Sequence, residues 1–353
     1  MNLIDLFQQL VQIDSPTGKE ENISNFVSNF IKEECNLTPL TDTHNNVFVK
    51  VKGVGEPIFF NAHLDTVQPG ENIVPIIENG IIKSQGNTIL GADNKASVAA
   101  ILSSLKDLNT NNLEHRPLEI LFTISEESEN LGAINFDKSM IKSKIGYIFD
   151  LNRPVGTIVK SAPFYARFSI KINGKSAHAS RRDLSIPAMD SLVEIINLIE
   201  KVRKKELIIN IGEINGGTAR NTVIGTISIE GEFRSVNKII FYKTKELLEK
   251  KLSDINDKTK SQISFEIIVE NPGYLHTDAE INYVKTTIEK ILNKKIDVIE
   301  TMGCSDGNIF NNEIGLTTFD LGDGGEGAHT TDESISISNL SLLKKLVTNL
   351  MIT

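Results

Sequence analysis

The chain has 353 residues, of which 24% are charged, and carries a formal net charge of −9 at pH 7. Its length exceeds that of most single hydrophobic cores and predicts two domains. The acidic balance argues against a nucleic-acid-binding protein, and no apolar run approaches the ~20 residues that a membrane-spanning helix needs. Two cysteines, Cys35 and Cys304, offer no disulfide framework, so we expect a cytoplasmic protein.

The first hundred residues are predicted to contain both helices and strands. The N-terminal residues lack the basic segment and long apolar core of a signal peptide. Residues 17–20 form a candidate capping box that opens a helix. The apolar face of that helix would consist of Ile23, Phe26, Val27, Phe30 and Ile31. Strands are expected at 46–52 and 57–62, and Asn79-Gly80 predicts a hairpin turn.

His63 and Asp65 directly follow an apolar run that predicts a short buried strand. They therefore lie at the carboxyl end of a strand, where open α/β sheets place their ligand crevice. A neutral imidazole there can bind a transition metal, and a carboxylate two residues further on can orient it. The same pattern is common in ordinary polar turns, so its meaning depends on the segments that follow.

Later segments place further acids, and a second histidine, at the ends of predicted elements. Asp93 precedes a helix rich in small residues, where a carboxylate is favoured; a plain N-cap is the alternative there. Glu126 and Glu127 follow a β-rich run, and Asp150 closes another apolar run. A glycine-rich segment then leads to His329. Several strand ends that all carry potential ligands are difficult to explain as ordinary loops.

Five of these residues form a donor set suited to a metal centre, with Glu126 left over. They supply two imidazoles and three carboxylates: His63, Asp93, Glu127, Asp150 and His329. Such ligands suit zinc, manganese or cobalt. One shared carboxylate could bridge two ions roughly 3.5 Å apart, the co-catalytic arrangement that activates water for hydrolysis. The spare Glu126, next to a ligand, is then placed to act as general base.

Between about residues 162 and 272 the predicted elements change character. Strands are expected at 164–172, 207–214, 222–233 and 263–269, and helices at 184–202 and 238–252. Their β-α-β-β-α-β order is typical of a ferredoxin-like fold. Because a helix at 280–292 and then His329 follow, we interpret this segment as an insertion into the first domain.

The ordered set of segments resembles the zinc exopeptidase superfamily of peptidase T, glutamate carboxypeptidase and aminoacylase, and is most similar to the peptidase T-like branch. The similarity covers essentially the whole chain, and any one segment is less specific than the ordered set. The matching segments are 62–66, 90–96, 125–127, 174–179, 216–221, 232–235, 305–311 and 328–330.

The chain departs from the family pattern at three places. Glu129 stands where the family usually has a glycine, and residues 181–188 differ from the usual run that ends in Asn-Ala. These departures concern lid geometry and substrate choice more than the metal site. Cys304 also replaces a usual glycine, either as a small buried side chain or as a thiol that contacts the metal.

The resemblance implies a three-layer α/β catalytic domain with a mixed, mostly parallel sheet, formed by residues 1–161 and 273–353. An inserted α+β ferredoxin-like lid at 162–272 would also mediate a homodimer. The resemblance also implies two divalent ions, with zinc favoured over cobalt or manganese. One ion would be bound by His63, Asp93 and Asp150. The other would be bound by Asp93, Glu127 and His329.

The resemblance also assigns roles to residues around the metals. Asp65 would orient His63, and Glu126 would act as general base. From the lid, His178 would donate to the developing oxyanion, and Asn221 and Arg234 would hold a substrate carboxylate or backbone. The family further implies a cis peptide bond between Asp93 and Asn94. The other histidines, His44, His115 and His276, are expected to be structural or on the surface.

These features predict metal-dependent hydrolysis of the amide bond of short peptides, with release of the N-terminal residue from tripeptides. By the resemblance, the aspartate at position 150 favours this reading, because in the superfamily aspartate there is typical of aminopeptidases and dipeptidases and glutamate of carboxypeptidases and deacylases. An N-acyl-amino-acid deacylase or carboxypeptidase is the alternative within the superfamily. A catalytically silent binding protein is the alternative outside it, although binding needs ligands and no base such as Glu126.

Overall fold

The computed structural model describes residues 1–313 and 315–352, and the chain divides into two compact units. Unit 1 contains the residues up to Lys160, His276–Glu300 and the described residues from Ser305 onward. Unit 2 contains Ser161–Leu275 and the short segment Thr301–Cys304. The sequence places this short segment in the other domain. It belongs to unit 2 because Thr301 N–H donates to Ser161 O and Arg234 donates to Met302 O.

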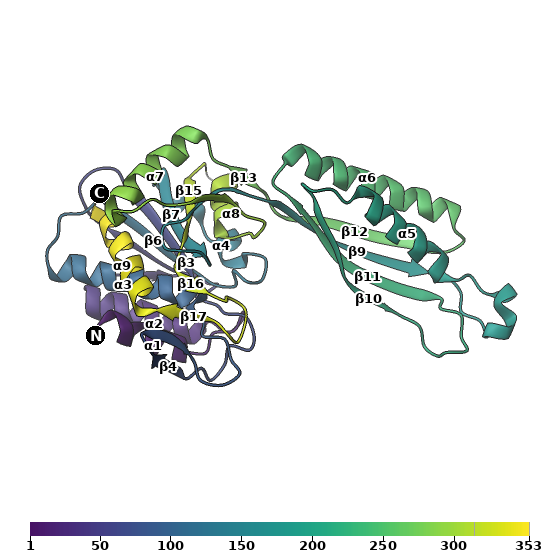
Figure 1. Cartoon of the computed structure of the whole chain (residues 1–353), viewed down its shortest axis with the longest axis horizontal. Coiled ribbons are helices and arrows are strands. Elements are labelled where there is room, and N and C mark those ends of the chain that lie inside the picture. Colours follow the sequence, from purple (N-terminus) through teal and green to yellow (C-terminus); the bar gives the residue numbers. More distant parts are fainter. Residues whose placement is uncertain (314, 353) are drawn as a thin grey trace. The chain divides into compact units, whose positions relative to one another are not determined.

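A mixed sheet, with most of its strands in unit 1, has the order β1-β2-β6-β3-β7-β15-β8-β13, with β14 beside β8 (Figure 1). The pairings among β6, β3, β7 and β15 are parallel, whereas the flanking pairings are antiparallel. The predicted mixed sheet is confirmed, and its parallel part is the centre. The strands are β1 (Leu40–Thr41), β2 (Val47–Val51), β3 (Ile58–His63), β6 (Leu118–Thr123), β7 (Ile145–Leu151), β8 (Ile158–Ala162), β13 (Tyr274–Leu275), β14 (Val298–Glu300) and β15 (Thr317–Gly322).

Side chains of the central strands alternate between two cores. Phe60 and Phe149 pack into the larger core, whereas Phe59 and Ile148 point into the smaller core on the opposite face. In the smaller core the Phe59 ring lies 5.0 Å from the ring of Phe310, measured between centroids. Burial on both faces is the usual environment of parallel strands between helix layers.

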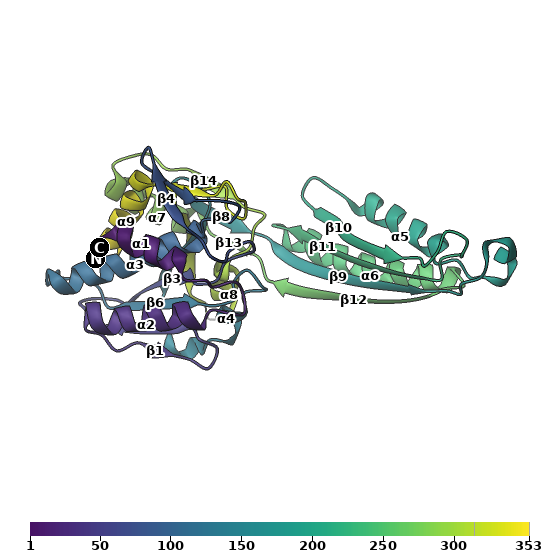
Figure 2. The same ribbon diagram turned by 90° about the horizontal axis from the view of Figure 1, so that it is seen from below.

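Helices cover both faces of this sheet, which gives the predicted three layers (Figures 1 and 2). One layer packs around α3 and contributes to the larger core, and the other lies against the smaller core. The first layer contains α1 (Leu3–Gln12), α2 (Glu21–Cys35), α3 (Ala92–Thr110), α7 (Asp278–Leu292) and α9 (Ile337–Ile352). The second contains α4 (Leu131–Asn135), η1 (Lys138–Met140) and α8 (Asp306–Glu313). No helix among the described residues is long and apolar enough to span a membrane.

The capping box predicted at residues 17–20 is wrong, although the helix that it was meant to open is present. α2 begins at Glu21, and Glu20 precedes it without a side-chain cap bond. Thr17 Oγ1 instead donates to Asp65 Oδ2 at 2.8 Å. Glu20 Oε1 accepts from Ser125 N–H at 3.0 Å. Both side chains that would form the box are therefore used to support the segments around His63 and Glu126.

A small antiparallel sheet, in the order β16-β17-β5-β4, lies beside the main one. The predicted hairpin turn is confirmed, because Asn79 and Gly80 both have positive φ angles, 51° and 79°, between β4 and β5. The strands are β4 (Pro75–Glu78), β5 (Ile81–Ser84), β16 (Gly325–Glu326) and β17 (Ser334–Ser336).

Unit 2 has the predicted ferredoxin-like fold (Figures 1 and 2). Its sheet is antiparallel in the order β10-β11-β9-β12, and α5 and α6 pack on one face. The elements are β9 (Phe164–Asn173), η2 (Ala179–Leu184), α5 (Ala188–Val202), β10 (Ile208–Gly216), β11 (Thr226–Ser235), α6 (Lys238–Lys258) and β12 (Gln262–Asn271).

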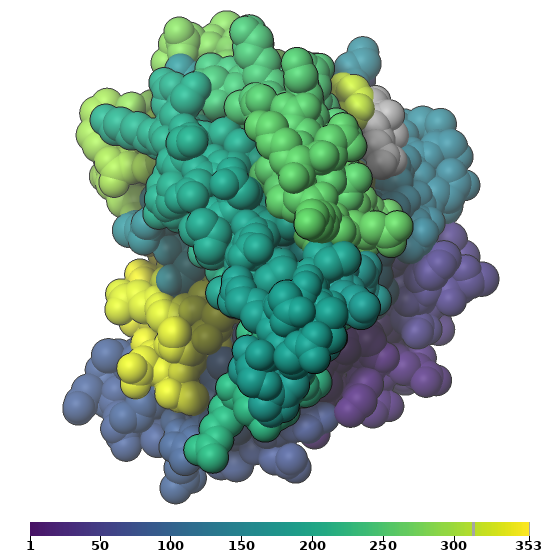
Figure 3. Space-filling view, turned by 90° about the vertical axis from the view of Figure 1, so that its right-hand side faces the viewer, coloured from purple at the N-terminus to yellow at the C-terminus, as the bar shows by residue number. Residues whose placement is uncertain are grey.

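Two elements of unit 2 start later than predicted. α5 begins after Pro187, because residues 179–184 form the short turn η2 and Ile186 pairs with Lys175. β11 begins at Thr226, because the preceding residues form a loop beside His178. Figure 3 views unit 2 from the end that carries these loops.

Candidate metal centre and active site

Three neighbouring parallel strands bring potential ligands to one edge of the unit 1 sheet. His63 is the last residue of β3, Glu127 follows β6, and Asp150 lies near the end of β7. Asp93 lies in the first turn of α3, and His329 occupies a loop after β16 with a φ of 64°. Because parallel strands end at the same edge, residues far apart in the sequence meet there.

The five predicted ligands form two of the three candidate groups found among the described residues, and these two groups share Asp93. The third group joins His63 to Glu126 and Glu127. His63 Nε2 lies 3.1 Å from Asp93 Oδ1 and 3.3 Å from Asp150 Oδ1. His329 Nε2 lies 2.8 Å from Glu127 Oε1 and 3.5 Å from Asp93 Oδ2. In each group the potential ligand atoms lie within 4.8 Å of one another. The two oxygens of Asp93 thus face different histidines, which is the placement that a bridging carboxylate needs.

The proton affinities of these groups show how strongly their charges interact. Burial raises the pKa of the Asp150 carboxyl to about 7, and the charges of Asp93 and Glu127 add to that rise. Hydrogen bonds to Asp93 and Glu127 raise the pKa of His329 to about 10. Burial opposes the charged form of His63, yet the charge of Asp150 raises its pKa well above the usual range. The raised pKa values mean that these side chains hold protons, and bound divalent cations would replace those protons. The donor set therefore fits two such ions.

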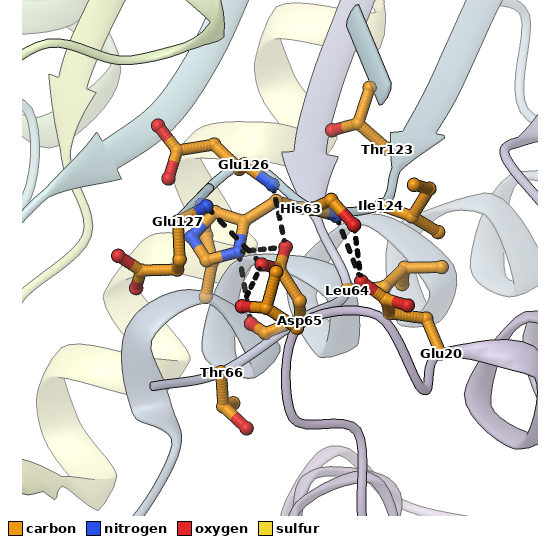
Figure 4. A network of polar contacts seen from close by, with 12 residues as sticks. Glu20, His63, Leu64, Asp65, Thr66, Thr123, Ile124, Glu126 and Glu127 are labelled. Carbon is orange, nitrogen blue, oxygen red and sulfur yellow. Dashed lines mark hydrogen bonds and ion pairs between the residues drawn. The ribbon is translucent and has the colours of Figure 1, made fainter. Parts of the chain in front are cut away.

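Asp65 organises the segment between the strand ends. Its Oδ1 lies 3.3 Å from His63 Nδ1 and accepts from Glu126 N–H at 2.9 Å. Its Oδ2 accepts from Glu127 N–H at 3.2 Å and from Thr17 Oγ1. Figure 4 shows the contacts of His63, Glu126 and Glu127 converging on Asp65, with the Glu126 and Glu127 carboxylates directed away from it. One buried carboxylate thus orients an imidazole and fixes the backbone of both glutamates.

A hydrogen-bond chain that sequence reasoning missed supports Glu126. Asn130 Nδ2 donates to Glu126 Oε1 at 2.9 Å and to Asp306 Oδ1 at 3.1 Å. Asp306 Oδ2 accepts from Thr123 Oγ1 at 2.5 Å. Burial raises the pKa of Glu126 well above its usual range, and the charges of Asp150 and Asp306 contribute.

Glu129 and Asn130 both have positive φ angles, 67° and 54°. The usual family glycine at position 129 was the available signal for this unusual backbone.

Glu333 was also missed, and it supports Asp93. Its Oε2 accepts from Leu90 N–H at 2.8 Å and Gly91 N–H at 2.7 Å, and its Oε1 accepts from Asp93 N–H at 2.9 Å. The peptide bond between Asp93 and Asn94 is cis, as predicted. A single buried carboxylate therefore connects the segment after His329 to the loop that presents Asp93. A lone glutamate has no local pattern that would have revealed this role.

His178 and Asn221 lie side by side in unit 2. Ser180 N–H donates to His178 Nδ1 at 3.2 Å, which favours the neutral tautomer with its proton on Nε2. Asn221 Nδ2 lies 3.5 Å from that Nε2, and Ala179 N–H donates to Asn221 O at 2.8 Å. Both side chains are exposed. His178 can therefore act as a hydrogen-bond donor through Nε2.

Arg234 belongs to β11 of the same unit, but its guanidinium is already engaged. It donates to both carboxylate oxygens of Glu232, at 2.7 and 2.8 Å, and to Met302 O at 2.8 Å. The resemblance assigns Arg234 to substrate binding and gives Glu232 no role, whereas an ion pair is the ordinary alternative for an arginine, and the structure shows such a pair. Cys304 is partly buried in the neighbouring segment, and the ligand groups found among the described residues contain no cysteine.

Of the remaining histidines, His276 is buried in unit 1. Its ring lies 4.6 Å from that of Phe319, measured between centroids. His44 is exposed, and His115 Nδ1 lies 2.7 Å from Arg116 O. None of the three belongs to the ligand groups found among the described residues.

Comparison with known proteins gives a consistent family assignment. The description of peptidase family M20/M25/M40 matches residues 59–353. A curated relative, the uncharacterized protein YqjE of Bacillus subtilis, is 32% identical over 98% of this chain and 96% of its own. The crystal structure of a tripeptidase from Staphylococcus aureus has a TM-score of 0.92 and 30% identity, and covers 99% of this chain and 96% of its own. That of aminopeptidase PepT from Bacillus cereus has a TM-score of 0.89 and 28% identity, and covers 99% of this chain and 97% of its own.

Proposed function

Because this chain belongs to peptidase family M20/M25/M40, we propose that it is a metal-dependent aminopeptidase that releases the N-terminal residue of tripeptides. The observation that carries the metal-dependent part is Asp93, whose two oxygens face two different histidine-acid groups. The similarity to a tripeptidase and to aminopeptidase PepT supports the substrate class. Asp150, rather than a glutamate, supports the aminopeptidase reading.

Two divalent ions, proposed to be zinc, would be held by the two groups of ligands. His63, Asp93 and Asp150 form the first group, and Asp93, Glu127 and His329 form the second. When bound, such ions act as Lewis acids on the scissile carbonyl and lower the pKa of water. The charge of the five donors suits this role, because three carboxylates balance most of the charge of two divalent ions.

Glu126 is the proposed general base. It accepts a proton from the attacking water and later passes that proton to the leaving amine. Its carboxylate is held at Oε1 by Asn130, and its backbone N–H is held by Asp65. Burial keeps the Glu126 pKa well above its usual range, so the carboxylate is a stronger base than an exposed glutamate.

The lid residues are proposed to bind the substrate. His178 donates from Nε2 to the developing oxyanion, supported by the Ser180 N–H that favours this tautomer. Asn221 and Arg234 bind the substrate backbone or carboxyl end. In a homodimer through the lid, the partner chain would supply His178.

A digest of a peptide library tests the proposal. With added zinc, cobalt or manganese, mass spectrometry should show loss of the N-terminal residue from free tripeptides, whereas N-acetylated tripeptides should resist. Cleavage of N-acyl amino acids with free tripeptides intact would identify a deacylase. Loss of C-terminal residues would identify a carboxypeptidase, and no turnover with any metal would favour a binding protein.

A further inference from the structure

The guanidinium of Arg234 is occupied by a carboxylate from its own strand. Arg234 Nε and Nη2 donate to Glu232 Oε1 at 3.1 and 2.8 Å, and Nη2 also donates to Oε2 at 2.7 Å. Nη1 donates to Met302 O at 2.8 Å. A guanidinium carries five N–H donors. These four contacts leave one donor for a substrate, so a two-pronged grip on a substrate carboxylate requires Glu232 to leave.

The surroundings keep both side chains together on the open face of the unit 2 sheet. Residues two apart in a strand share a face. Arg234 lies opposite Tyr165 on β9, and its guanidinium carbon is 4.8 Å from the centre of that ring. Glu232 lies opposite Arg167, but Arg167 forms its ion pair with Glu270. Glu232 therefore has Arg234 as its cationic partner.

The Glu232–Arg234 pair is accessible to solutes. The side chains are 25% and 26% exposed, so a ligand can reach the pair without unfolding of the sheet. Burial and the charge of Glu232 raise the pKa of the Tyr165 hydroxyl to about 12, which keeps that hydroxyl protonated beside the carboxylate. The guanidinium of Arg234 therefore already binds one carboxylate in the absence of substrate.

We propose that Glu232 is a built-in competitor for Arg234 and determines which carboxyl ends the enzyme accepts. This inference rests on the proposed function, in which Arg234 binds the substrate's carboxyl end. A free carboxylate can replace Glu232, because it offers the same charge and the same two oxygens to the guanidinium. A neutral C-terminal amide lacks that charge and does not replace Glu232. It can accept only from the one N–H donor of Arg234 that remains free of other contacts. Glu232 thus weakens the binding of peptide acids and leaves the binding of peptide amides unaffected.

Steady-state kinetics with matched peptides test the competition. Trialanine and trialanine amide are compared on the zinc-loaded enzyme and on its Glu232→Gln variant, which keeps the side chain's size and removes its charge. Because partly exposed ion pairs are weak, we expect the KM for the acid to fall roughly threefold to fivefold. The KM for the amide should stay the same. Glu232→Asp, which keeps the charge but shortens the side chain, should give an intermediate fall.

Glu230→Gln is the matched control. Glu230 lies two residues earlier on the same face of β11, and its carboxylate accepts from Ser169 Oγ at 2.5 Å rather than from a cation. Its removal should change neither KM. Thermal melting of each variant shows whether the fold is retained. A KM for the acid that rises in Glu232→Gln, or KM values that change in parallel for acid and amide, would overturn the proposal.

Binding measurements separate this inference from the proposed function. Calorimetric titration of both peptides in a Glu126→Gln background, with and without Glu232→Gln, reports Kd without turnover. Tighter binding of the acid alone, together with no cleavage of either peptide by the zinc-loaded enzyme that retains Glu126, would refute the aminopeptidase and keep the competitor. Cleavage of both peptides without that change in Kd would do the reverse.

Discussion

At the scale of single residues, the chemistry depends on carboxylates that differ in their surroundings. Asp93 lies between two histidines, Asp65 is saturated by backbone and hydroxyl donors, and Glu126 is buried beside other acids. The same functional group can therefore serve as bridge, as orienting residue and as base. Each role leads to a different expected result when the charge is removed.

Replacement of Glu126 by glutamine should lower kcat by ~10²-fold or more, in line with typical general-base contributions. The metal content should remain unchanged, because the proposed ligands are other residues. Glu129→Gln is the matched control, since Glu129 is exposed and three residues away. Steady-state kinetics and elemental analysis of both variants give the result. Near-normal turnover in Glu126→Gln would remove this residue from the mechanism.

Metal binding should release protons, because His329 and His63 have raised pKa values. With a pKa of about 10, His329 carries a proton at pH 8 that a cation must displace. Asp150, with a pKa of about 7, adds a further proton as the pH falls below 7. The apparent zinc affinity should therefore decrease from pH 8 to pH 6. Calorimetry in buffers of different ionisation enthalpy measures the protons released, and an affinity independent of pH would contradict these assignments.

At the scale of secondary-structure elements, the site depends on where strands end. The sequence predicts β3, β6 and β7 and their terminal His63, Glu127 and Asp150, because apolar runs followed by polar residues are local patterns. The ferredoxin-like order of unit 2 is predictable for the same reason.

The supporting residues could not be predicted from local patterns. Glu333 and Asp93 are 240 positions apart, and Asn130 and Asp306 are 176 apart. Only the folded chain brings such pairs together. The capping box failed because Thr17 and Glu20 form tertiary contacts that compete with a local motif.

The Glu333 carboxylate should matter for both stability and metal affinity. Glu333→Ala leaves the N–H groups of Leu90, Gly91 and Asp93 without their acceptor, which costs about 1–3 kcal/mol for a buried unsatisfied group. Zinc affinity should fall with it, because the loop that presents Asp93 is loosened. Chemical denaturation and zinc titration measure the two effects. Asp332→Asn, an exposed neighbour, is the control, and equal behaviour of the two variants would show that Glu333 has no supporting role.

At the scale of the whole molecule, the two units have different proposed roles. Unit 1 contains the candidate metal ligands and Glu126, and unit 2 contains His178, Asn221 and Arg234. The family match and the solved structures establish this architecture as that of peptidase family M20/M25/M40.

The His178→Ala variant tests whether the lid takes part in catalysis. Loss of an oxyanion donor should lower kcat by ~10²–10³-fold with little change in metal content. Asn221 lies beside His178, so Asn221→Ala should raise KM more than it lowers kcat. Sedimentation of the active enzyme shows whether a second chain is present. Full activity in His178→Ala would exclude the donor role, and a fully active monomer would exclude a contribution from a partner chain.

The most direct test of the central claim is a zinc titration of the metal-free protein, followed by the release of free N-terminal amino acid from a tripeptide. Activity should rise to its maximum at about two ions per chain, as expected for a co-catalytic pair. Asp93→Ala should bind neither ion tightly, because both ligand groups share this residue. Activity complete without zinc, or two tightly bound ions in Asp93→Ala, would contradict the account.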